Sequence, residues 1–273
     1  LALIGCVPDC KTSAEDPVLY GHRSVNGMEI YFVSNQSDRE ITMTPEFRVK
    51  GMLPELWDAT TGNVRKLPAY SQSETGTSIP MKLDIYESAF IVFREKAAES
   101  GSSSLEDNYP SAKIVAEFNN DWTVTFDKAK RGPAEPVKMN QLIDITTSEN
   151  PDIKYYSGTI LYQNTFKLEN TSSKDGQLYV DLNNVCAMAK VKINGKYAGG
   201  VWTAPYRLAI NDFVKDGENE IEIEVTTTWV NRIIGDLNLP EDQRRTWVTF
   251  QPWRADSPLQ KSGLVGPVVI EEN

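Results

Sequence analysis

Histidine is almost absent from this sequence, and its scarcity limits the chemistry that the chain can perform. The single histidine is His22, and no Gly-x-Ser-x-Gly motif surrounds any serine. A serine hydrolase needs a base beside its nucleophile, and a His-x-x-x-His pair would be needed for one common type of catalytic zinc site. The glycine-rich loops that bind phosphates or dinucleotides are also missing. We therefore interpret His22 as structural and expect none of these enzyme classes.

Cysteine is scarce as well, with three residues, Cys6, Cys10 and Cys186. An odd number in a chain of this length does not make a disulfide framework. Cys6 and Cys10 are near enough in sequence to pair, but no further cysteines or histidines complete a zinc site. We interpret the three as small, semi-buried thiols.

Positive charge and long apolar runs are the other features that the sequence lacks. Its 28 Lys and Arg face 38 Asp and Glu, which leaves a net charge of −10. A nucleic-acid binder needs a basic surface, so we expect no nucleic-acid partner. No apolar run reaches the roughly 18 residues of a membrane span, so no span is expected. The 273 residues, 40% of them hydrophobic, are enough for one large or two medium domains.

What is present is a succession of short alternating segments, which predicts β-strands. In the first part of the chain the predicted strands are residues 28–33, 40–44, 47–49, 56–58, 64–67 and 88–93. The loop at residues 34–38 predicts a hairpin between the first two, and residues 59–63 predict a turn. Strands of this length and spacing indicate a small β-sandwich.

A polar stretch at residues 99–104, rich in serine, interrupts the pattern and predicts a linker. It divides the chain into two predicted domains. The predicted divisions are an N-terminal segment at 1–16, a small β-sandwich at 17–95, a linker at 96–112 and a second domain at 113–273.

The second part of the chain is again rich in predicted strands, at residues 123–126, 159–166, 177–182, 189–193 and 220–225. Asn194-Gly195 predicts a tight hairpin, because both central residues of such a turn need a positive φ. Residues 220–225 place carboxylates on one face and Ile or Val on the other. No amphipathic helix longer than two turns is expected, and an antiparallel jelly-roll-like sandwich fits best.

Aromatic residues near polar ones suggest a carbohydrate site, because sugar faces stack on rings while Asn, Asp or Arg bind hydroxyls. The candidate carbohydrate-binding residues are Trp202, Tyr206, Trp229, Asn231, Arg232, Asp236 and Trp253. The alternative interpretation is that these rings fill the core of a sandwich. Glycosidases need two carboxylates, and the sequence does not identify such a pair among its many.

Several of these segments together resemble known glycoside hydrolases. The order of residues 189–196, 200–206 and 217–221 resembles the galactose-binding-like domain of these enzymes. A narrower resemblance is to the C-terminal part of glycoside hydrolase family 106, the α-L-rhamnosidases. The segments that carry it are residues 30–35, 54–62, 155–159, 229–236 and 262–268.

This resemblance implies a fold and a role. The expected fold is all-β, with two β-sandwich domains, the second a galactose-binding-like jelly roll. The catalytic carboxylates of the family belong to an upstream barrel, so no catalytic residue is assigned here. The chain would be a non-catalytic accessory region of a bacterial enzyme. Its expected partners are that barrel and glycan or plant-type polysaccharide fragments.

The resemblance also bears on location and cofactors. It implies an extracytoplasmic protein, whether periplasmic, outer-membrane-attached or secreted. Leu3 to Cys6 resembles a lipoprotein cleavage box, whereas Val7 to Asp9 resembles the join to the family's barrel, which we prefer. Galactose-binding-like folds often hold a structural calcium, but no dense acidic loop identifies its ligands here.

Three alternatives stay open at this stage. The chain could act as a free-standing carbohydrate-binding protein, which would show an exposed aromatic patch. It could be a small glycosidase, which would need two carboxylates converging in one pocket. A truncated homologue that only binds a partner would expose an apolar face for docking.

Overall fold

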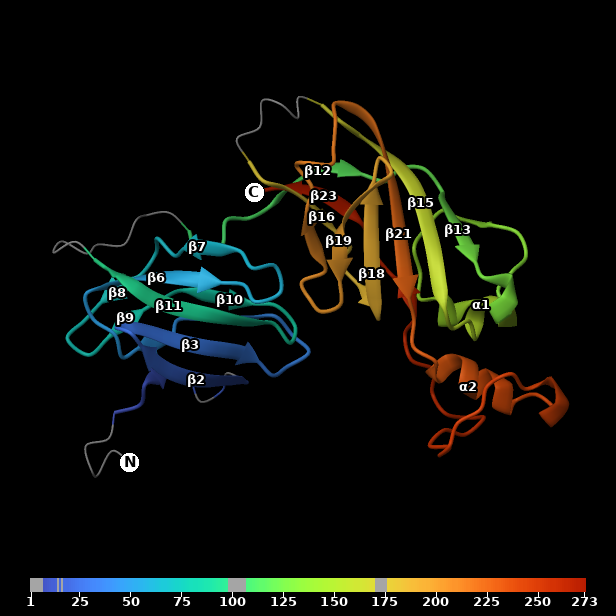
Figure 1. Ribbon diagram of the computed structural model, residues 1–273, viewed down its shortest axis with the longest axis horizontal. Coiled ribbons are helices and arrows are strands. Elements are labelled where there is room, and N and C mark those ends of the chain that lie inside the picture. The colour runs from blue at the N-terminus through green and yellow to red at the C-terminus, as the bar shows by residue number, and fades with distance from the viewer. Residues whose placement is uncertain (1–6, 14, 16, 98–106, 170–175) are drawn as a thin grey trace. The chain divides into compact units, whose positions relative to one another are not determined.

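The computed structural model describes residues 7–13, 15, 17–97, 107–169 and 176–273. Its regular structure is mostly β, which confirms the predicted all-β class (Figure 1). The chain divides into two compact units, Leu1–Ser111 and Ala112–Asn273. The lipoprotein-like box at residues 3–6 and the serine-rich stretch at 99–104 lie outside the described residues. Among the described residues, no helix is long and apolar enough to cross a membrane.

The first unit is built on a five-stranded antiparallel sheet in the order β2-β3-β11-β6-β7. These strands are β2 (Val18–Val25), β3 (Met28–Asn35), β11 (Ser88–Lys96), β6 (Met52–Trp57) and β7 (Val64–Lys66). Shorter strands form two further sheets: β1 (Cys10–Lys11), β5 (Glu46–Phe47), β9 (Thr77–Ser78) and β8 (Ser71–Gln72) in one, and β10 (Met81–Leu83) and β4 (Ile41–Met43) in the other. Tyr31, Phe47 and Phe93 meet in the core between them.

The predicted hairpin between residues 28–33 and 40–44 is wrong. β3 pairs instead with β2, and β4 lies in another sheet, where it pairs with β10. The turn of the real hairpin is Asn26-Gly27, whose φ angles of 52° and 80° suit a tight two-residue connection. Residues 36–40 therefore carry the chain from one sheet to the other. The turn predicted between residues 56–58 and 64–67 is confirmed, because β6 pairs with β7.

His22 and Cys10 are held inside this unit. The His22 ring stacks on Tyr31 with a centroid distance of 4.1 Å, and its Nε2 lies 2.7 Å from Glu29 Oε2. Cys10 is a buried free thiol, and burial together with the Asp9 charge raises its pKa to about 12. A thiol with so high a pKa is a poor nucleophile at neutral pH, which fits a packing role.

The segment that leads out of the first unit is fixed to it at Asn108. This buried amide donates from Nδ2 to the carbonyls of Ala69 and Pro80, at 2.7 and 3.0 Å. Its Oδ1 accepts the N–H of Ala69 at 2.8 Å. Asn108 is therefore packed into the first unit, Leu1–Ser111.

Glu87 is expected to make the first unit lose stability as the pH rises. Burial is the main cause that raises its pKa from 4.5 to about 7, and the nearby Asp84 and Asp58 charges add to it. The pKa of Glu87 is higher in the folded protein than in the unfolded chain. Its contribution to the free energy of unfolding is therefore complete below about pH 4.5 and is lost as the pH rises through about 7. Glu87→Gln should therefore be more stable than the wild type at about pH 8, by about 1–2 kcal/mol since the site is partly exposed.

Urea unfolding followed by NMR signals of β11 amides would measure this difference across the pH range. The exposed Glu74→Gln variant is the matched control and should follow the wild type at every pH. A stability difference between Glu87→Gln and wild type that does not change with pH would contradict the prediction.

The second unit is a sandwich of two larger antiparallel sheets. One has the order β14-β13-β15-β21-β18-β19, and the other β12-β23-β16-β20. The strands of the first are β14 (Val137–Met139), β13 (Trp122–Phe126), β15 (Thr159–Leu168), β21 (Gly217–Thr226), β18 (Met188–Ile193) and β19 (Lys196–Val201). Those of the second are β12 (Lys113–Glu117), β23 (Val269–Glu272), β16 (Leu178–Asp181) and β20 (Arg207–Ala209). A short pair, β17 (Val185–Cys186) and β22 (Gly263–Leu264), completes the unit.

Two sequence predictions for this unit are confirmed. Asn194 and Gly195 have φ angles of 51° and 75° and join β18 to β19 as a hairpin. In β21 the residues Ile221, Ile223 and Val225 are buried, while the intervening glutamates lie on the outer face. The finer assignment of the sandwich to a galactose-binding-like jelly roll stays a prediction.

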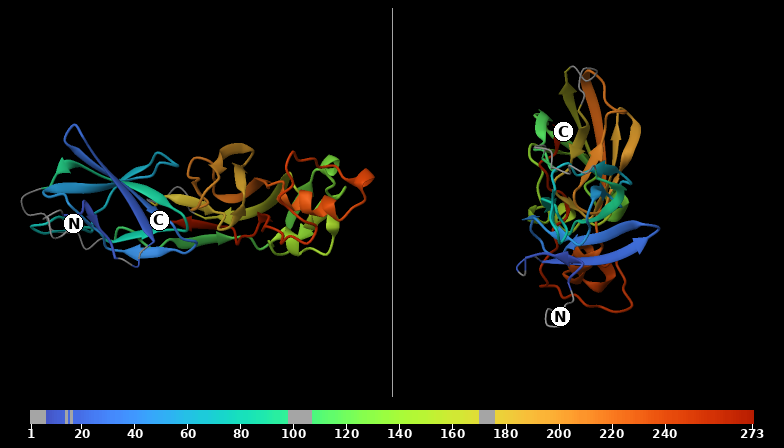
Figure 2. Two further views of the ribbon diagram at one scale, coloured as in Figure 1. Left: turned by 90° about the horizontal axis from the view of Figure 1, so that it is seen from below. Right: turned by 90° about the vertical axis from the view of Figure 1, so that its left-hand side faces the viewer.

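Helices occupy one end of the second unit. α2 (Val230–Leu237) has eight residues, slightly more than the two turns that the sequence analysis allowed, and α1 (Pro151–Lys154) has four. Short 3₁₀ turns lie at Lys128–Lys130, Ile145–Thr147 and Glu241–Gln243. α2 and the loops around it lie beside the green segment that contains α1, in Figure 1 and in the left view of Figure 2. This end brings together residues that are far apart in the sequence.

Candidate functional site

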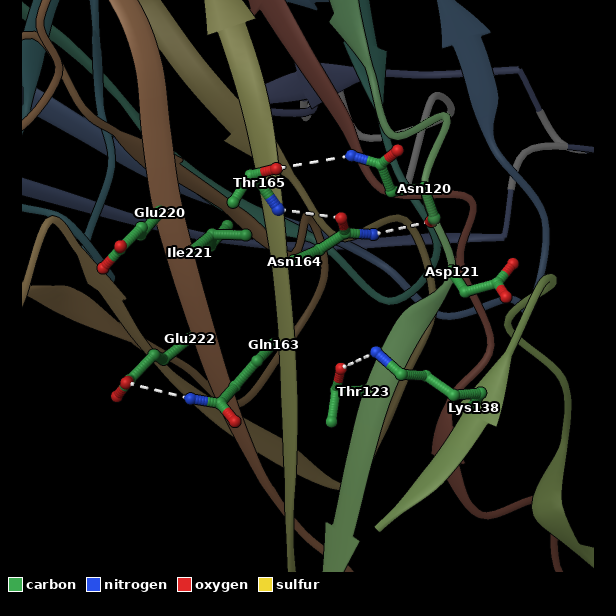
Figure 3. A pocket seen from close by; sticks show the side chains of 10 residues that line it. All are labelled: Asn120, Asp121, Thr123, Lys138, Gln163, Asn164, Thr165, Glu220, Ile221 and Glu222. Atoms are coloured by element: carbon green, nitrogen blue, oxygen red, sulfur yellow. Dashed lines mark hydrogen bonds between the residues drawn. The ribbon is translucent and has the colours of Figure 1, made fainter.

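A groove of about 420 Å³ lies on the outer face of the six-stranded sheet and is shown in Figure 3. We call it the sheet groove. It is lined by Asn120, Asp121, Thr123, Lys138, Gln163, Asn164, Thr165, Glu220, Ile221 and Glu222. Half of these side chains come from same-face positions of β13, β15 and β21, because alternate residues of a strand point to the same face.

Cross-strand pairing sets the arrangement of the groove. Gln163 faces Glu222 across β15 and β21, and its Nε2 donates to Glu222 Oε1 at 3.2 Å. On the neighbouring strands, Lys138 Nζ donates to Thr123 Oγ1 at 2.6 Å. These contacts hold an amide, a carboxylate, an ammonium group and a hydroxyl along one surface.

An asparagine pair closes one end of the groove (Figure 3). Asn164 Nδ2 donates to the carbonyl of Asn120 at 3.0 Å, and Asn120 Nδ2 donates to Thr165 Oγ1 at 3.4 Å. Such amide and hydroxyl groups offer both donors and acceptors to sugar hydroxyls. No aromatic ring is among the described residues that line the groove, so binding there would rest on hydrogen bonds.

The Asp121 carboxylate of the groove does not converge with the two glutamates, Glu220 and Glu222, which project side by side from β21. Figure 3 shows Asp121 pointing to one side and Glu220 and Glu222 pointing to the other. A glycosidase places its two carboxyl groups on either side of one bond, about 5–10 Å apart. Among the described residues, no group of three or more His, Cys, Asp or Glu side chains gathers as metal ligands would.

The structure separates the seven residues predicted from sequence into two sets. Trp202 and Trp229 are exposed, at 69% and 54%, and Trp253 is half-buried. Tyr206 is half-buried against the core of the sandwich. The other three residues, Asn231, Arg232 and Asp236, belong to α2 and are buried.

Asn231 and Asp236 bind the protein's own backbone. Asn231 Nδ2 donates to the Gln260 carbonyl at 2.6 Å, and its Oδ1 accepts the Gln260 N–H at 2.9 Å. Asp236 Oδ2 accepts the N–H groups of Arg245 and Thr246 at 2.9 and 2.8 Å, and the Thr246 hydroxyl at 2.9 Å. Both side chains therefore hold the loop that follows α2.

Arg232 instead lines a second concavity, which we call the basic cavity. It has a volume of about 490 Å³ and is lined by Lys128, Arg131, Gly132, Pro151, Asp152, Tyr155, Arg232, Gly235, Asn238, Leu239 and Arg245. Gly235 allows Tyr155 and Arg232 to pack closely against α2, because a Cβ there would lie 2.6 Å from the Tyr155 ring and 2.7 Å from Arg232 Nη2. Burial lowers the pKa of Arg232, although Asp236 opposes this. Burial would raise the pKa of Asp236, but hydrogen bonds from Arg245 and Thr246 together with Arg232 lower it.

Sequence reasoning missed most of both concavities. The sheet groove could have been predicted in part, because the alternating pattern of β15 and β21 is visible in the sequence and shows that their amides and carboxylates share one outer face. Nothing local marks Arg131 or Tyr155 as neighbours of Arg232, because they come from segments far away in the sequence. Two exposed aromatic residues, Trp247 at 83% and Phe250 at 79%, were also outside the predicted set.

Two family models match the chain. Residues 1–72 match the model described as alpha-L-rhamnosidase. Residues 87–250, more than half of the chain, match the model described as glycosyl hydrolases family 2, sugar binding domain.

The chain is similar to a rhamnosidase from Novosphingobium sp. PP1Y of known structure, with a TM-score of 0.86 and 34% identity over the whole chain. It is also 36% identical over 158 residues, 49% of the chain, to a putative beta-glucuronidase from Formosa agariphila. The chain spans 26% of that rhamnosidase and 14% of that glucuronidase relative.

Proposed function

The chain belongs to the family described as glycosyl hydrolases family 2, sugar binding domain, and from this premise we propose that it is a non-catalytic accessory region of a glycoside hydrolase. It is a rhamnosidase-like region with a sugar-binding domain. The likeness of the whole chain to about a quarter of a rhamnosidase carries the proposal. The catalytic barrel would lie in the part of the parent enzyme that this chain does not include. That enzyme would act on rhamnose-containing polysaccharide outside the cytoplasm.

Support of that barrel is the first proposed role. Trp247 and Phe250 lie close together in the loop after α2, and each exposes a large apolar side chain. Contiguous exposed apolar surface marks interaction sites in soluble proteins, and two such rings three residues apart in sequence can contribute to one. We therefore propose that the part of the loop after α2 that carries Trp247 and Phe250 meets the catalytic domain.

Contact with glycan is the second proposed role. The sheet groove supports it, because its amides, hydroxyl groups and carboxylates can bind several sugar hydroxyls together. Of the residues predicted from sequence, we retain Trp202 and Trp229 as stacking platforms outside the sheet groove, since their rings are exposed.

Calorimetric titration with rhamnose-containing oligosaccharides would test the glycan role, beside a hydrolysis assay on an aryl α-L-rhamnoside. We expect weak binding without turnover. Gln163→Ala should weaken binding about 2–10-fold, the value of one hydrogen bond. Lys196→Ala, on the exposed end of the β18–β19 hairpin, is the matched control and should bind as the wild type does.

Two results would contradict the proposal. Turnover by a clean preparation would show a small glycosidase. Unchanged affinity in Gln163→Ala would place the sugar elsewhere than in the sheet groove.

A further inference from the structure

The basic cavity is a concentration of positive charge in a chain of net charge −10. Four of its lining residues are cationic, namely Lys128, Arg131, Arg232 and Arg245, and Asp152 is the one carboxylate among them. Of the residues that the structure describes, none lines both this cavity and the sheet groove. The basic cavity therefore needs an explanation of its own.

Arg232 is the buried centre of the cavity. Its side chain is 7% exposed, and its Nε has no hydrogen-bond partner among the described residues. That atom lies 3.2 Å from Asp236 Oδ1, close enough for charge attraction but not aligned for a hydrogen bond. A buried guanidinium without a full set of partners is costly unless a further anion compensates it.

Asp236 cannot compensate the arginines around it by itself. Its Oδ1 faces both Arg232 Nε and Arg131 Nη1, the latter at 3.4 Å. Its Oδ2 is already occupied by the N–H groups of Arg245 and Thr246 and by the Thr246 hydroxyl. With Asp152 included, four cationic side chains face two carboxylates. The cavity thus has room and charge for another carboxylate.

The remaining walls suit a sugar ring rather than a bare ion. The cavity volume of about 490 Å³ falls in the range of small-molecule sites, about 300–1,000 Å³. Tyr155 supplies an aromatic ring and Leu239 an apolar surface. Asn238 donates from Nδ2 to the carbonyls of Ile234 and Ala255, and its Oδ1 has no donor among the described residues. That oxygen can accept a hydroxyl.

From this geometry we propose that the basic cavity binds a uronic acid residue of an acidic glycan, with the sugar carboxylate held by Arg232, Arg131 and Arg245. Guanidinium groups bind carboxylates through paired, charge-assisted hydrogen bonds. The choice of a sugar as the carrier of the carboxylate rests on the proposed function, whereas the anion site rests on the cavity alone.

The test is a titration of the whole chain with sodium D-galacturonate, D-galactose and inorganic phosphate, followed by NMR and calorimetry. We expect saturable binding of galacturonate, weakened by added salt, with shifts at the Gly235 and Tyr155 amides. Galactose and phosphate should bind at least tenfold more weakly.

Arg245→Gln is the informative variant, because its exposed side chain can change while its backbone N–H still binds Asp236. It should weaken galacturonate binding about tenfold. Arg254→Gln, an exposed arginine of the same loop that does not line the cavity, is the matched control and should have no effect.

Each contrary result overturns the proposal in a distinct way. Equal affinity for galactose would show that the cavity does not recognise the carboxylate, and equal affinity for phosphate would show that it does not recognise the sugar ring. If galacturonate shows no saturable binding, the cavity does not bind a uronic acid, and an acidic side chain of another domain becomes the candidate occupant. Gln163→Ala separates the two sites, because it should weaken binding of the neutral rhamnose-containing oligosaccharide and leave galacturonate binding unchanged.

Discussion

Replacing Asp236 by alanine is expected to lower the free energy of unfolding of the second unit by about 3–5 kcal/mol. The carboxylate is buried and is the common partner of Arg131, Arg232, Arg245 and Thr246. Without it, two guanidinium groups lose their counter-ion, and two backbone N–H groups lose their acceptor. Removing one partner of a buried charge costs more than the pair itself contributes, because the remaining charge stays desolvated.

Urea unfolding followed by tryptophan fluorescence would measure this loss, because five of the six tryptophans, Trp122, Trp202, Trp229, Trp247 and Trp253, lie in the second unit. The exposed Asp242→Ala variant, six residues further along the chain, is the control and should change stability by less than about 0.5 kcal/mol. If Asp236→Ala unfolds at the wild-type urea concentration, Asp236 is not a structural residue and a ligand role returns.

Asn219→Ala is the second substitution with a large expected effect, about 2–4 kcal/mol on the same unit. The buried Asn219 side chain accepts at Oδ1 from Asn194 Nδ2 and from the Lys215 N–H, both at 2.9 Å. Its Nδ2 donates to the carbonyls of Lys215 and Gly217 at 2.8 and 3.1 Å. The amide thus ties the turn before β21 to the β18–β19 hairpin, and truncation leaves several of these groups without a partner.

The neighbouring Glu218→Ala substitution is the matched control, since Glu218 precedes Asn219 in β21 and is exposed. Urea unfolding should separate the two variants clearly. The readout beyond stability is amide exchange in the Asn194-Gly195 turn, which should accelerate in Asn219→Ala and not in Glu218→Ala. Stability equal to that of the control would show that water replaces the lost hydrogen bonds.

Strand patterns were predictable where the signal is local. Asn194-Gly195 and the alternation of residues 220–225 depend on φ preferences and on the two-residue period of a strand, which neighbours along the chain suffice to specify. The hairpin turn at Asn26-Gly27 has the same Asn-Gly sequence as Asn194-Gly195, yet the hairpin was predicted at the loop of residues 34–38. Loop composition alone does not distinguish a hairpin from a crossing between sheets, because the partner strand, β10, lies about forty residues away.

The candidate sites depended still more on distant neighbours. The polar residues beside Trp229 suggested sugar contact. Asn231, however, is hydrogen-bonded to Gln260, and Asp236 accepts hydrogen bonds from Arg245 and Thr246. Arg232, from the same helix, instead meets Arg131 and Tyr155 in the basic cavity. Spacing along a helix shows which side chains share a face, but not whether that face meets backbone, charge or solvent.

By itself the sequence determined the all-β class, several turns and the resemblance to rhamnosidases, because turn preferences and short motifs are properties of neighbouring residues. The tertiary structure alone decided which polar side chains have their hydrogen bonds satisfied within the protein and which line a cavity. Burial and hydrogen-bond partners arise from strand pairing and packing between segments up to a hundred residues apart, such as Arg131 and Asp236. These contacts separate the residues that stabilise the second unit from those available to a ligand.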